Sequence, residues 1–462
     1  MNRPVTRGST HTPILVFAGI VGLSVLFFFI FSAGSFGKRD APPAAAPAPV
    51  VRAPSTPSRS STPSTASSPA QPGETPAGIP QISAFASPEA LLSELAVGLT
   101  AGDFASVEKF TAATDFTAPR VAFLKHLLTD CGWRVATANP WADAGSITGV
   151  SRRELKLEPA SPDAARPAGA VMADIERVAG AGWKVKAWRF DPALVTQATA
   201  LLSTKSITVP ASALTDPPDP LDQARHFLTN ILSHDFKAAR SITEAAGVTH
   251  EKLAGLCIVF EEGDYHIAAT RPVVVTAGTA DSAWAIVKVR SDKENLDSEV
   301  GLEMQRTAAG EWRIHALDFN KMLESYVQAS EAGTVFYSPL VKSAKGGESI
   351  VLYFEFDKAG LHPRALHQLD IISSLLKSDP ARKMRITGHT DAIGSDDYNA
   401  RLSASRAKNV HARLLELGVA STQIETIGFG SKAPLDADKR ADGSDNPEGR
   451  SRNRRTEIYL DF

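Results

Sequence analysis

An acidic and a basic residue near the C-terminus have the spacing needed to form one charged site. Asp391 follows the run 384–389, which has the composition of a strand, and Arg406 falls within a helix expected from about Asp397 to Leu417. Gly418 would end that helix. The helix face that carries the arginine consists of residues at three- and four-residue steps: Asn399, Leu402, Arg406, Val410, Leu414 and Leu417.

A guanidinium on an apolar helix face is costly to desolvate unless a carboxylate meets it, and Asp391 is the nearest candidate. Two interpretations follow. In the first, Asp391 and Arg406 form a structural ion pair. In the second, both line a pocket in which the acid faces an ammonium group and the arginine binds a carboxylate. Such a pocket would bind a zwitterion.

The elements around these two residues have the order β-α-β-α-β-β. Apolar periodicity predicts helices that begin near Pro363 and Asp397, and strands at 349–356, 384–389, 424–428 and 456–460. This order predicts an α/β sandwich with helices over one sheet. His389 lies beside Asp391, but no histidine or cysteine follows at zinc-ligand spacing, which favours a structural role for His389.

The motifs of this region resemble the OmpA-like peptidoglycan-binding domain, the family of the C-terminal parts of OmpA, Pal and the flagellar stator protein MotB. The resemblance covers about residues 348–462. It is carried by Thr387-Gly388-His389-Thr390-Asp391, Tyr398-Asn399, Leu402-Ser403, Arg406-Ala407, Val410, Gly418-Val419, Gly428-Phe429-Gly430, Pro434 and Gly449-Arg450-x-x-Asn453-Arg454-Arg455. It implies binding, without cleavage, of the peptide stem of peptidoglycan through the free amino acid end of diaminopimelate.

The resemblance also assigns roles to residues. Asp391 would meet the ammonium group of diaminopimelate and Arg406 its carboxylate. Further binding residues would be Asp357, Asn399 and Arg454, with Thr390, Leu402 and Asn453 in support, the last of them behind Arg454. Two features depart from the family pattern: Ile393 replaces a small hydroxyl residue, and the loop 436–448 is long and charged. No metal and no cofactor is expected.

Length, charge and cysteine content limit the remaining possibilities. The 462 residues predict about three domains plus connecting segments. The 49 basic and 51 acidic residues nearly cancel and form no basic stripe, which argues against a nucleic-acid partner. Cys131 and Cys257 fit no C-x-x-C pattern, so they either pair as one long-range disulfide or remain buried thiols, and buried thiols are favoured.

The N-terminal segment, residues 1–37, is expected to hold a short cytoplasmic tail and a transmembrane helix. No ionisable residue occurs from Thr12 to Gly37, and the apolar run 14–31 is long enough for a hydrocarbon core of about 30 Å. A cleaved signal peptide is the alternative, because Ser32-Ala33-Gly34 is a cluster of small residues. The absence of an ionisable residue in this span argues against a motor role like that of MotB.

Residues 38–81 are expected to form a disordered linker. Proline, alanine, serine and threonine make up most of this stretch, which has few charges and cannot bury a core. A polyproline II conformation would give residues 41–80 a reach of about 120 Å, and a fully flexible chain would give nearer ~35 Å.

An internal repeat follows, at residues 82–205 and 214–330. Three landmark pairs are 132 residues apart and three later pairs are 129 apart: Pro88/Pro220, Phe104/Phe236, Pro140/Pro272, then Trp183/Trp312, Phe190/Phe319 and Leu194/Leu323. Each copy is expected to have two helices followed by antiparallel strands, with a last strand at 183–187 or 312–316 that places Trp, Val or Ile, and Ala on one face. This order of elements resembles the NTF2-like fold.

The repeats contain residues that suggest either a catalytic or a structural role. Asp264, His266 and His315 could supply an acid and a base, but Arg134 and Lys186 match the two histidines in the first copy. We therefore expect spacer or partner-docking modules and no enzyme.

The sequence as a whole predicts a multidomain α+β protein whose final domain, 346–462, follows a polar joint at 328–348. It would be anchored in the inner membrane by one helix, with most of the chain in the periplasm, and its partners would be the lipid bilayer and peptidoglycan. If the N-terminal segment is cleaved, a periplasmic or outer-membrane location is the alternative. The alternative function is that of a wall-anchoring subunit of an envelope or secretion machine, with protein partners docked on the repeats.

Overall fold

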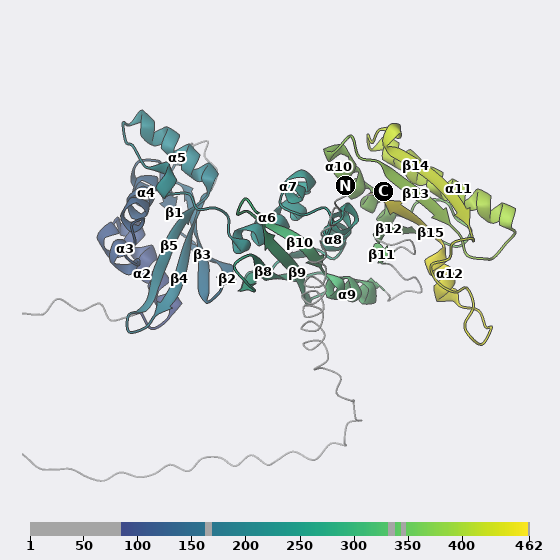
Figure 1. Cartoon of the computed structure of the whole chain (residues 1–462), viewed down its shortest axis with the longest axis horizontal. Coiled ribbons are helices and arrows are strands. Elements are labelled where there is room, and N and C mark those ends of the chain that lie inside the picture. The colour runs from purple at the N-terminus through teal and green to yellow at the C-terminus, as the bar shows by residue number, and fades with distance from the viewer. Residues whose placement is uncertain (1–84, 162–168, 331–337, 343–347, 461–462) are drawn as a thin grey trace, which may run out of the picture. The chain divides into compact units, whose positions relative to one another are not determined.

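The computed structural model describes residues 85–161, 169–330, 338–342 and 348–460 (Figure 1). The transmembrane helix and the linker predicted from the sequence lie outside these residues. Within them, none of the helices combines the length and the apolar character needed to cross a bilayer.

The first repeat consists of helices followed by antiparallel strands and a final helix. The helices are α2 (Pro88–Ala101), α3 (Phe104–Phe110), α4 (Thr117–Thr129) and α5 (Pro192–Thr204). The strands are β1 (Trp133–Val135), β2 (Trp141–Ile147), β3 (Val150–Pro159), β4 (Gly169–Val178) and β5 (Gly182–Phe190). A 3-10 turn, η2 (Ala211–Ala213), leads to the second repeat.

The second repeat has the same order of elements. Its helices are α6 (Pro220–Leu232), α7 (Phe236–Ser241), α8 (His250–Glu262) and α9 (Asn320–Ser330). Its strands are β6 (Tyr265–Ile267), β7 (Val273–Ala277), β8 (Ser282–Ser291), β9 (Leu296–Arg306) and β10 (Trp312–Asp318). Only two helices were predicted before the strands of each repeat, and α4 and α8 are the third helices that the prediction lacked. It also missed the closing helices α5 and α9.

The two repeats share one sheet. Its strand order is β10-β9-β8-β7-β2-β3-β4-β5, and β1 and β6 pair with β3 and β8. The repeats meet where β2 and β7 run parallel, with Ser146 opposite Val274. The helices of the first repeat pack on their own apolar core, which is separate from the core of the second repeat.

A buried arginine also joins the repeats. The side chain of Arg152 on β3 is fully buried, and three of its N–H groups each donate over 2.6 Å to a different carboxylate, those of Asp174, Asp219 and Asp222. Asp219 and Asp222 form the capping box at the start of α6. The first repeat therefore neutralises the acidic N-terminus of a helix in the second.

The last strand of each repeat contains a β-bulge. The pairing register shifts between Val185 and Ala187 in β5, and between Ile314 and Ala316 in β10. The bulge changes the alternation of the strand, so Trp188 and Leu317 are buried while both alanines are only partly buried. The prediction that Trp, Val or Ile, and Ala lie on one face of this strand was therefore wrong for the alanines.

The C-terminal domain is an α/β sandwich built on a five-stranded sheet of order β11-β12-β15-β13-β14. The strands are β11 (Leu340–Lys342), β12 (Glu348–Tyr353), β13 (Met384–His389), β14 (Ile424–Gly430) and β15 (Arg455–Tyr459). The helices are α10 (Pro363–Ser378), α11 (Asp396–Glu416) and α12 (Pro447–Asn453), with a 3-10 turn η3 (Ser421–Gln423). Strand β11 lies within the stretch expected to be a polar joint, and α12 begins in the stretch expected to be a loop.

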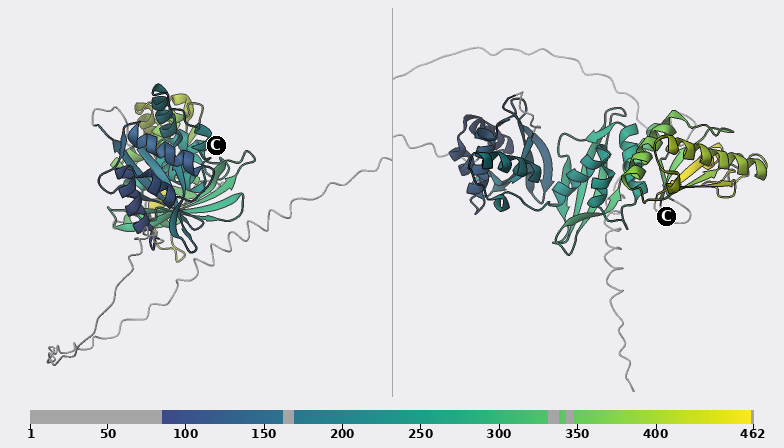
Figure 2. Two further views of the ribbon diagram at one scale, coloured as in Figure 1. Left: turned by 90° about the vertical axis from the view of Figure 1, so that its left-hand side faces the viewer. Right: turned by 90° about the horizontal axis from the view of Figure 1, so that it is seen from above.

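Helix α11 packs on β13 and β14 (Figure 2). Two glycines permit the close approach. A Cβ atom at Gly388 would lie 2.0 Å from the Ser403 carbonyl oxygen, and one at Gly428 would lie 2.8 Å from the Ala404 nitrogen. The packing brings the helix face that carries Arg406 against the strand end that carries Asp391.

The C-terminal domain shares its apolar core with the second repeat. Helices α8 and α10 pack together. The buried carboxylate of Glu251 on α8 accepts a hydrogen bond from the Leu460 backbone N–H over 2.5 Å, and Glu262 accepts one from Gln368 over 2.7 Å. The second repeat is thus fixed to the domain that follows it.

Cys131 and Cys257 are both buried thiols. The favoured interpretation of two buried thiols is confirmed.

Candidate functional site

A pocket of about 200 Å³ opens at the C-terminal end of β13 and the N-terminal end of α11. This volume is far larger than the roughly 10–15 Å³ that a single water requires. The pocket is lined by Phe356, Asp357, Thr390, Asp391, Ile393, Gly394, Tyr398, Asn399, Leu402, Arg406 and Arg454. The five residues expected to bind a ligand, and two of the three expected to support them, therefore lie around one cavity.

Asp391 forms an ion pair with Arg454 at the wall of this pocket. Arg454 Nη1 donates to Asp391 Oδ2 over 3.0 Å, and the two side chains are 14% and 4% exposed. The second carboxylate oxygen, Oδ1, accepts a hydrogen bond from the Ile393 backbone N–H over 3.3 Å. The structural ion pair considered for Asp391 is thus made with Arg454 and not with Arg406.

Arg406 is fully buried and is held by backbone carbonyl groups. Its Nε donates to Lys358 O over 2.8 Å, its Nη1 to His389 O over 2.8 Å, and its Nη2 to Glu355 O over 3.3 Å. Burial lowers the pKa of Arg406 to about 10, with Asp391 opposing the shift and Arg454 adding to it, so Arg406 is protonated at neutral pH. These three bonds use three of its five N–H donors and leave two for a ligand.

Two further polar groups at the pocket have no partner among the described residues. Thr390 Oγ1 and Asn399 Nδ2 are buried, and neither makes a hydrogen bond. A buried donor without an acceptor costs about 1–3 kcal/mol. Both groups are therefore ready to bind an acceptor that enters the pocket.

Asp357 and Tyr398 form the outer edge of the site. The Tyr398 hydroxyl donates a hydrogen bond to Asp357 Oδ1, and this bond raises the pKa of Tyr398. Asp357 has a left-handed backbone conformation, with φ of 57°. Strand β12 ends at Tyr353. Phe356 therefore lies beyond the strand, and it is 54% exposed. The predicted continuation of this strand to Phe356 was wrong.

Asn453 stabilises the loop that borders the site. Its Oδ1 accepts from the backbone N–H groups of Leu435 and Asp436, and its Nδ2 donates to Asp438 Oδ1 over 2.7 Å. Asp438 Oδ2 in turn accepts from the Ala392 backbone N–H over 2.6 Å. Asn453 thus fixes the loop beside Asp391, whereas the sequence analysis placed it behind Arg454.

His389 belongs to the core and does not line the pocket. Its side chain is 4% exposed, stacks on the Phe429 ring at 5.5 Å, and shares a hydrogen bond of 3.0 Å with Thr387 Oγ1. Burial lowers the pKa of His389 to about 4, and the nearby Arg455 adds to this effect. The imidazole is therefore neutral at physiological pH.

Sequence reasoning missed the apolar rim of the site. Phe356, Ile393 and Tyr398 are 54%, 47% and 41% exposed, although each has a large apolar side chain. Ile393 was singled out only as a departure from the family pattern, and Tyr398 only as part of a motif. The available signal was their position in the sequence: Phe356 and Tyr398 directly precede Asp357 and Asn399, and Ile393 lies two residues after Asp391.

A model described as the OmpA family matches residues 353–454. A stretch of 138 residues is 33% identical to photosystem I P700 chlorophyll a apoprotein A2 of Gloeobacter violaceus, and covers 29% of this chain and 16% of that protein. A stretch of 107 residues is 39% identical to the peptidoglycan-binding protein ArfA of Mycobacterium tuberculosis, and covers 23% of this chain and 31% of that protein.

Among solved structures, the peptidoglycan-associated lipoprotein from Burkholderia pseudomallei is 29% identical with a TM-score of 0.22, over 24% of this chain and 89% of that chain. The chain spans less than a third of the length of the two curated relatives named above. The resemblance inferred from the motifs is confirmed: residues 353–454 form a domain of the OmpA family.

Proposed function

We propose that the C-terminal domain binds peptidoglycan noncovalently, through the free amino acid end of diaminopimelate in the stem peptide. The observation that carries this proposal is the pocket in which Asp391, Arg406 and Arg454 lie beside the unpaired donors of Thr390 and Asn399. A relative that shares 39% identity over 107 residues is named a peptidoglycan-binding protein.

The charges of the pocket suit a zwitterion. Two carboxylates, Asp357 and Asp391, and two guanidinium groups, Arg406 and Arg454, line it, so their formal charges cancel. An ammonium group would be held by Asp391, with Asp357 nearby. A carboxylate would accept hydrogen bonds from the two remaining donors of Arg406 and from Thr390 and Asn399. A ligand with only one of the two charges would leave half of these groups unpaired.

We infer binding without cleavage. The residues that line the pocket include no histidine and no cysteine, and Thr390 Oγ1 has no base as a hydrogen-bond partner among the described residues. Nucleophilic catalysis needs a base within hydrogen-bond reach of the nucleophile.

Co-sedimentation of the full chain with purified sacculi of the diaminopimelate type tests the proposal. Asp391→Asn removes the charge and keeps the shape of the side chain, so we expect binding to fall at least about tenfold, because hydrogen bonds to charged groups contribute roughly 1.5–3 kcal/mol. Asp442→Asn is the matched control, because Asp442 is exposed and bonds only within its own turn. Equal sedimentation of the wild type and Asp391→Asn would remove the assignment.

We further propose that this domain links the cell wall to the inner membrane, through the predicted helix at 14–31 and the linker at 38–81. The N-terminal residue of the mature protein, determined by mass spectrometry, tests this step. Retention of residues 1–37 supports the anchor, and a mature chain that begins after Ala33 supports the periplasmic or outer-membrane alternative.

The second candidate is a wall-anchoring subunit of a larger envelope machine. The continuous core between the second repeat and the C-terminal domain favours it, because a shared core would hold any protein docked on the repeats in a fixed position beside the wall. Photo-crosslinking of the full chain in cells from Phe116, which is 51% exposed on the first repeat, tests it. A single crosslinked protein partner supports the machine subunit, and its absence supports the simple tether.

A further inference from the structure

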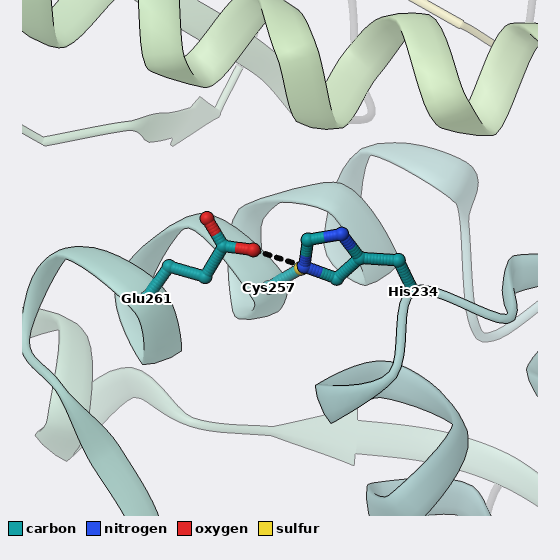
Figure 3. A group of neighbouring side chains, drawn as sticks. All are labelled: His234, Cys257 and Glu261. Atoms are coloured by element: carbon teal, nitrogen blue, oxygen red, sulfur yellow. Dashed lines mark ion pairs between the residues drawn. The ribbon is translucent and has the colours of Figure 1, made fainter.

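A histidine, a cysteine and a glutamate of the second repeat lie together on one side of α8. Cys257 and Glu261 are one helical turn apart, and His234 lies in the turn between α6 and α7. One potential ligand atom from each residue lies within 4.8 Å of those from the other two. Figure 3 shows the His234 imidazole facing the Glu261 carboxylate, with Cys257 beside them.

The three side chains offer one nitrogen, one sulfur and one oxygen atom. Zinc binds these atoms at about 2.0–2.3 Å, so two ligands of a tetrahedral site are separated by about 3.5 Å. The cluster is therefore close to the required size before any adjustment. Calcium and magnesium take oxygen ligands, and the thiol argues against both.

The conformation of His234 indicates that the cluster is not required by the fold. His234 has a φ of 58°, in the left-handed region, and the matching residue of the first repeat, Gly102, has a φ of 75°. Glycine adopts this conformation without strain, whereas a histidine does so at a cost. The residues that match Cys257 and Glu261 are Lys125 and Thr129, so the first repeat has the same helix without the cluster.

A second histidine orients the glutamate. His367 on α10 of the C-terminal domain lies with its Nε2 atom 2.5 Å from Glu261 Oε2, while Glu261 Oε1 pairs with His234 Nε2. Carboxylates that bind metals are commonly held by such an outer partner. Here the outer partner belongs to the domain that packs on the second repeat.

Exposure differs among the three side chains. Cys257 is 1% exposed, while the side chains of His234 and Glu261 are 35% and 23% exposed. An ion could therefore enter from solvent and keep a water molecule as its fourth ligand, as zinc does in open sites. Burial raises the pKa of Cys257, and Glu261 adds to this effect, so the thiol keeps its proton until a cation replaces it.

We propose that His234, Cys257 and Glu261 form a binding site for a zinc-class divalent ion, with water as the fourth ligand and His367 as the outer partner of Glu261. On binding, the Cys257 thiol loses its proton to solvent and the thiolate sulfur bonds to the metal. The ion would fasten the α6–α7 turn to α8, next to the contact with α10.

Titration of the reduced, metal-free full chain with Co²⁺ tests the site. Stoichiometric binding should give a sulfur-to-cobalt charge-transfer band and the intense visible bands of tetrahedral cobalt, both removed by an equivalent of Zn²⁺. Cys257→Ser should abolish the charge-transfer band. Cys131→Ser is the matched control, because Cys131 is equally buried and also donates to a backbone carbonyl over 3.8 Å.

If Cys257→Ser does not fold, a second variant, His234→Gly, still tests the site. Glycine is the residue found at this position in the first repeat and relieves the left-handed strain, which offsets the lost contact with Glu261, so this variant should stay folded without metal. It should nevertheless lose stoichiometric binding. His367→Gln should weaken binding by about 10- to 100-fold, as expected for an outer partner.

Three results would overturn the proposal. They are the absence of a charge-transfer band in the wild type, its retention in Cys257→Ser, and wild-type affinity in His234→Gly. The cluster would then be a pair of histidine–glutamate contacts beside an inert thiol.

Discussion

Arg454 and Asp391 are joined by a hydrogen-bonded ion pair, with Nη1 and Oδ2 3.0 Å apart at the wall of the pocket. The pair neutralises an almost fully buried carboxylate. A ligand ammonium group that approaches Asp391 must therefore share the carboxylate with Arg454 or displace the guanidinium.

The first prediction concerns the stability of this pair. Arg454→Gln leaves the Asp391 carboxylate without its cation, and should lower the free energy of unfolding by about 3 kcal/mol, because an unpaired buried charge is costly. The double variant Asp391→Asn/Arg454→Gln should recover much of that loss. Urea unfolding of the single and double variants measures the coupling. Strictly additive effects would show that the two side chains do not stabilise each other.

A second prediction separates the charge of Asp357 from the hydrogen bond that Asp357 accepts from Tyr398. Asp357→Asn removes the charge and tolerates the left-handed conformation, so the domain should stay folded while sacculus binding falls about tenfold, by loss of one charge-assisted interaction.

Tyr398→Phe is the matched control, because it removes only the hydroxyl that bonds to Asp357. Its binding should stay within about threefold of the wild type. If Tyr398→Phe lost as much binding as Asp357→Asn, the hydroxyl would be the group that matters. The charge of Asp357 would then have no part in binding.

A third prediction concerns the packing of α11 on β13. Gly388→Ala would place a Cβ atom 2.0 Å from the Ser403 carbonyl oxygen, so the helix and the strand must separate. We expect a loss of about 1–3 kcal/mol or more, as for other overpacked sites, together with weaker sacculus binding, because Arg406 and Asp391 lie on these two elements. Gly360→Ala is the control, since no atom lies within 4 Å of its Cβ position. Thermal unfolding that is unchanged in Gly388→Ala would contradict the observed packing.

The sequence predicted the elements of the C-terminal domain well where apolar periodicity was strong. Strand β13 has its expected bounds, Met384–His389, and α11 begins one residue before the expected start. Helix α12 was missed because residues 447–453 are polar and charged, and the helix is stabilised by Asn446 and Pro447 at its N-terminus and not by an apolar face.

The site could be predicted only in part. Asp391 and Arg406 were identified from their positions, but spacing alone could not show that Arg454, 63 residues after Asp391, would be the ion-pair partner. Nor could it show that Arg406 would be held by three carbonyl groups, because backbone acceptors leave no trace in the sequence. That these residues bind a ligand stays a prediction.

The fold of the repeats could also be predicted only in part. The constant offset between the landmark residues identified the two copies, and the order of their elements is indeed the same. The bulges in β5 and β10 were not predicted, because Trp183, Val185 and Ala187 alternate as in an unbroken strand, whereas the buried residues of β5 are Val185 and Trp188. The parallel pairing of β2 with β7 depends on contacts between the copies, which no pattern within one copy reveals.

A fourth prediction concerns pH. The pKa of His389 is about 4 in the folded chain, against 6.5 for an unperturbed histidine. Above pH 6.5 the imidazole is neutral in both states. As the pH falls from 6.5 towards 4, the unfolded chain takes up a proton that the folded chain does not. The free energy of unfolding should therefore fall, by about 3 kcal/mol at most.

Hydrogen exchange of the β13 amides at pH 7 and pH 5 measures this effect. His389→Gln should show a smaller loss of protection between the two values than the wild type. Glu457, which lies 3.9 Å from His389 and has a lowered pKa, titrates below its ordinary value of 4.5 and so contributes little in this window. Equal losses in both proteins would contradict the burial of a neutral imidazole.

The central claim is that the pocket recognises both charges of an amino acid end group. The most direct test is titration of the full chain, by calorimetry, with two soluble muropeptides that differ only in the third residue of the stem. In one this residue is diaminopimelate, and in the other it is lysine, which has the ammonium group without the neighbouring carboxylate. We predict binding of the diaminopimelate muropeptide and at least about tenfold weaker binding of the lysine muropeptide, because Arg406, Thr390 and Asn399 would then lack their acceptor. Equal affinity for the two would contradict the account.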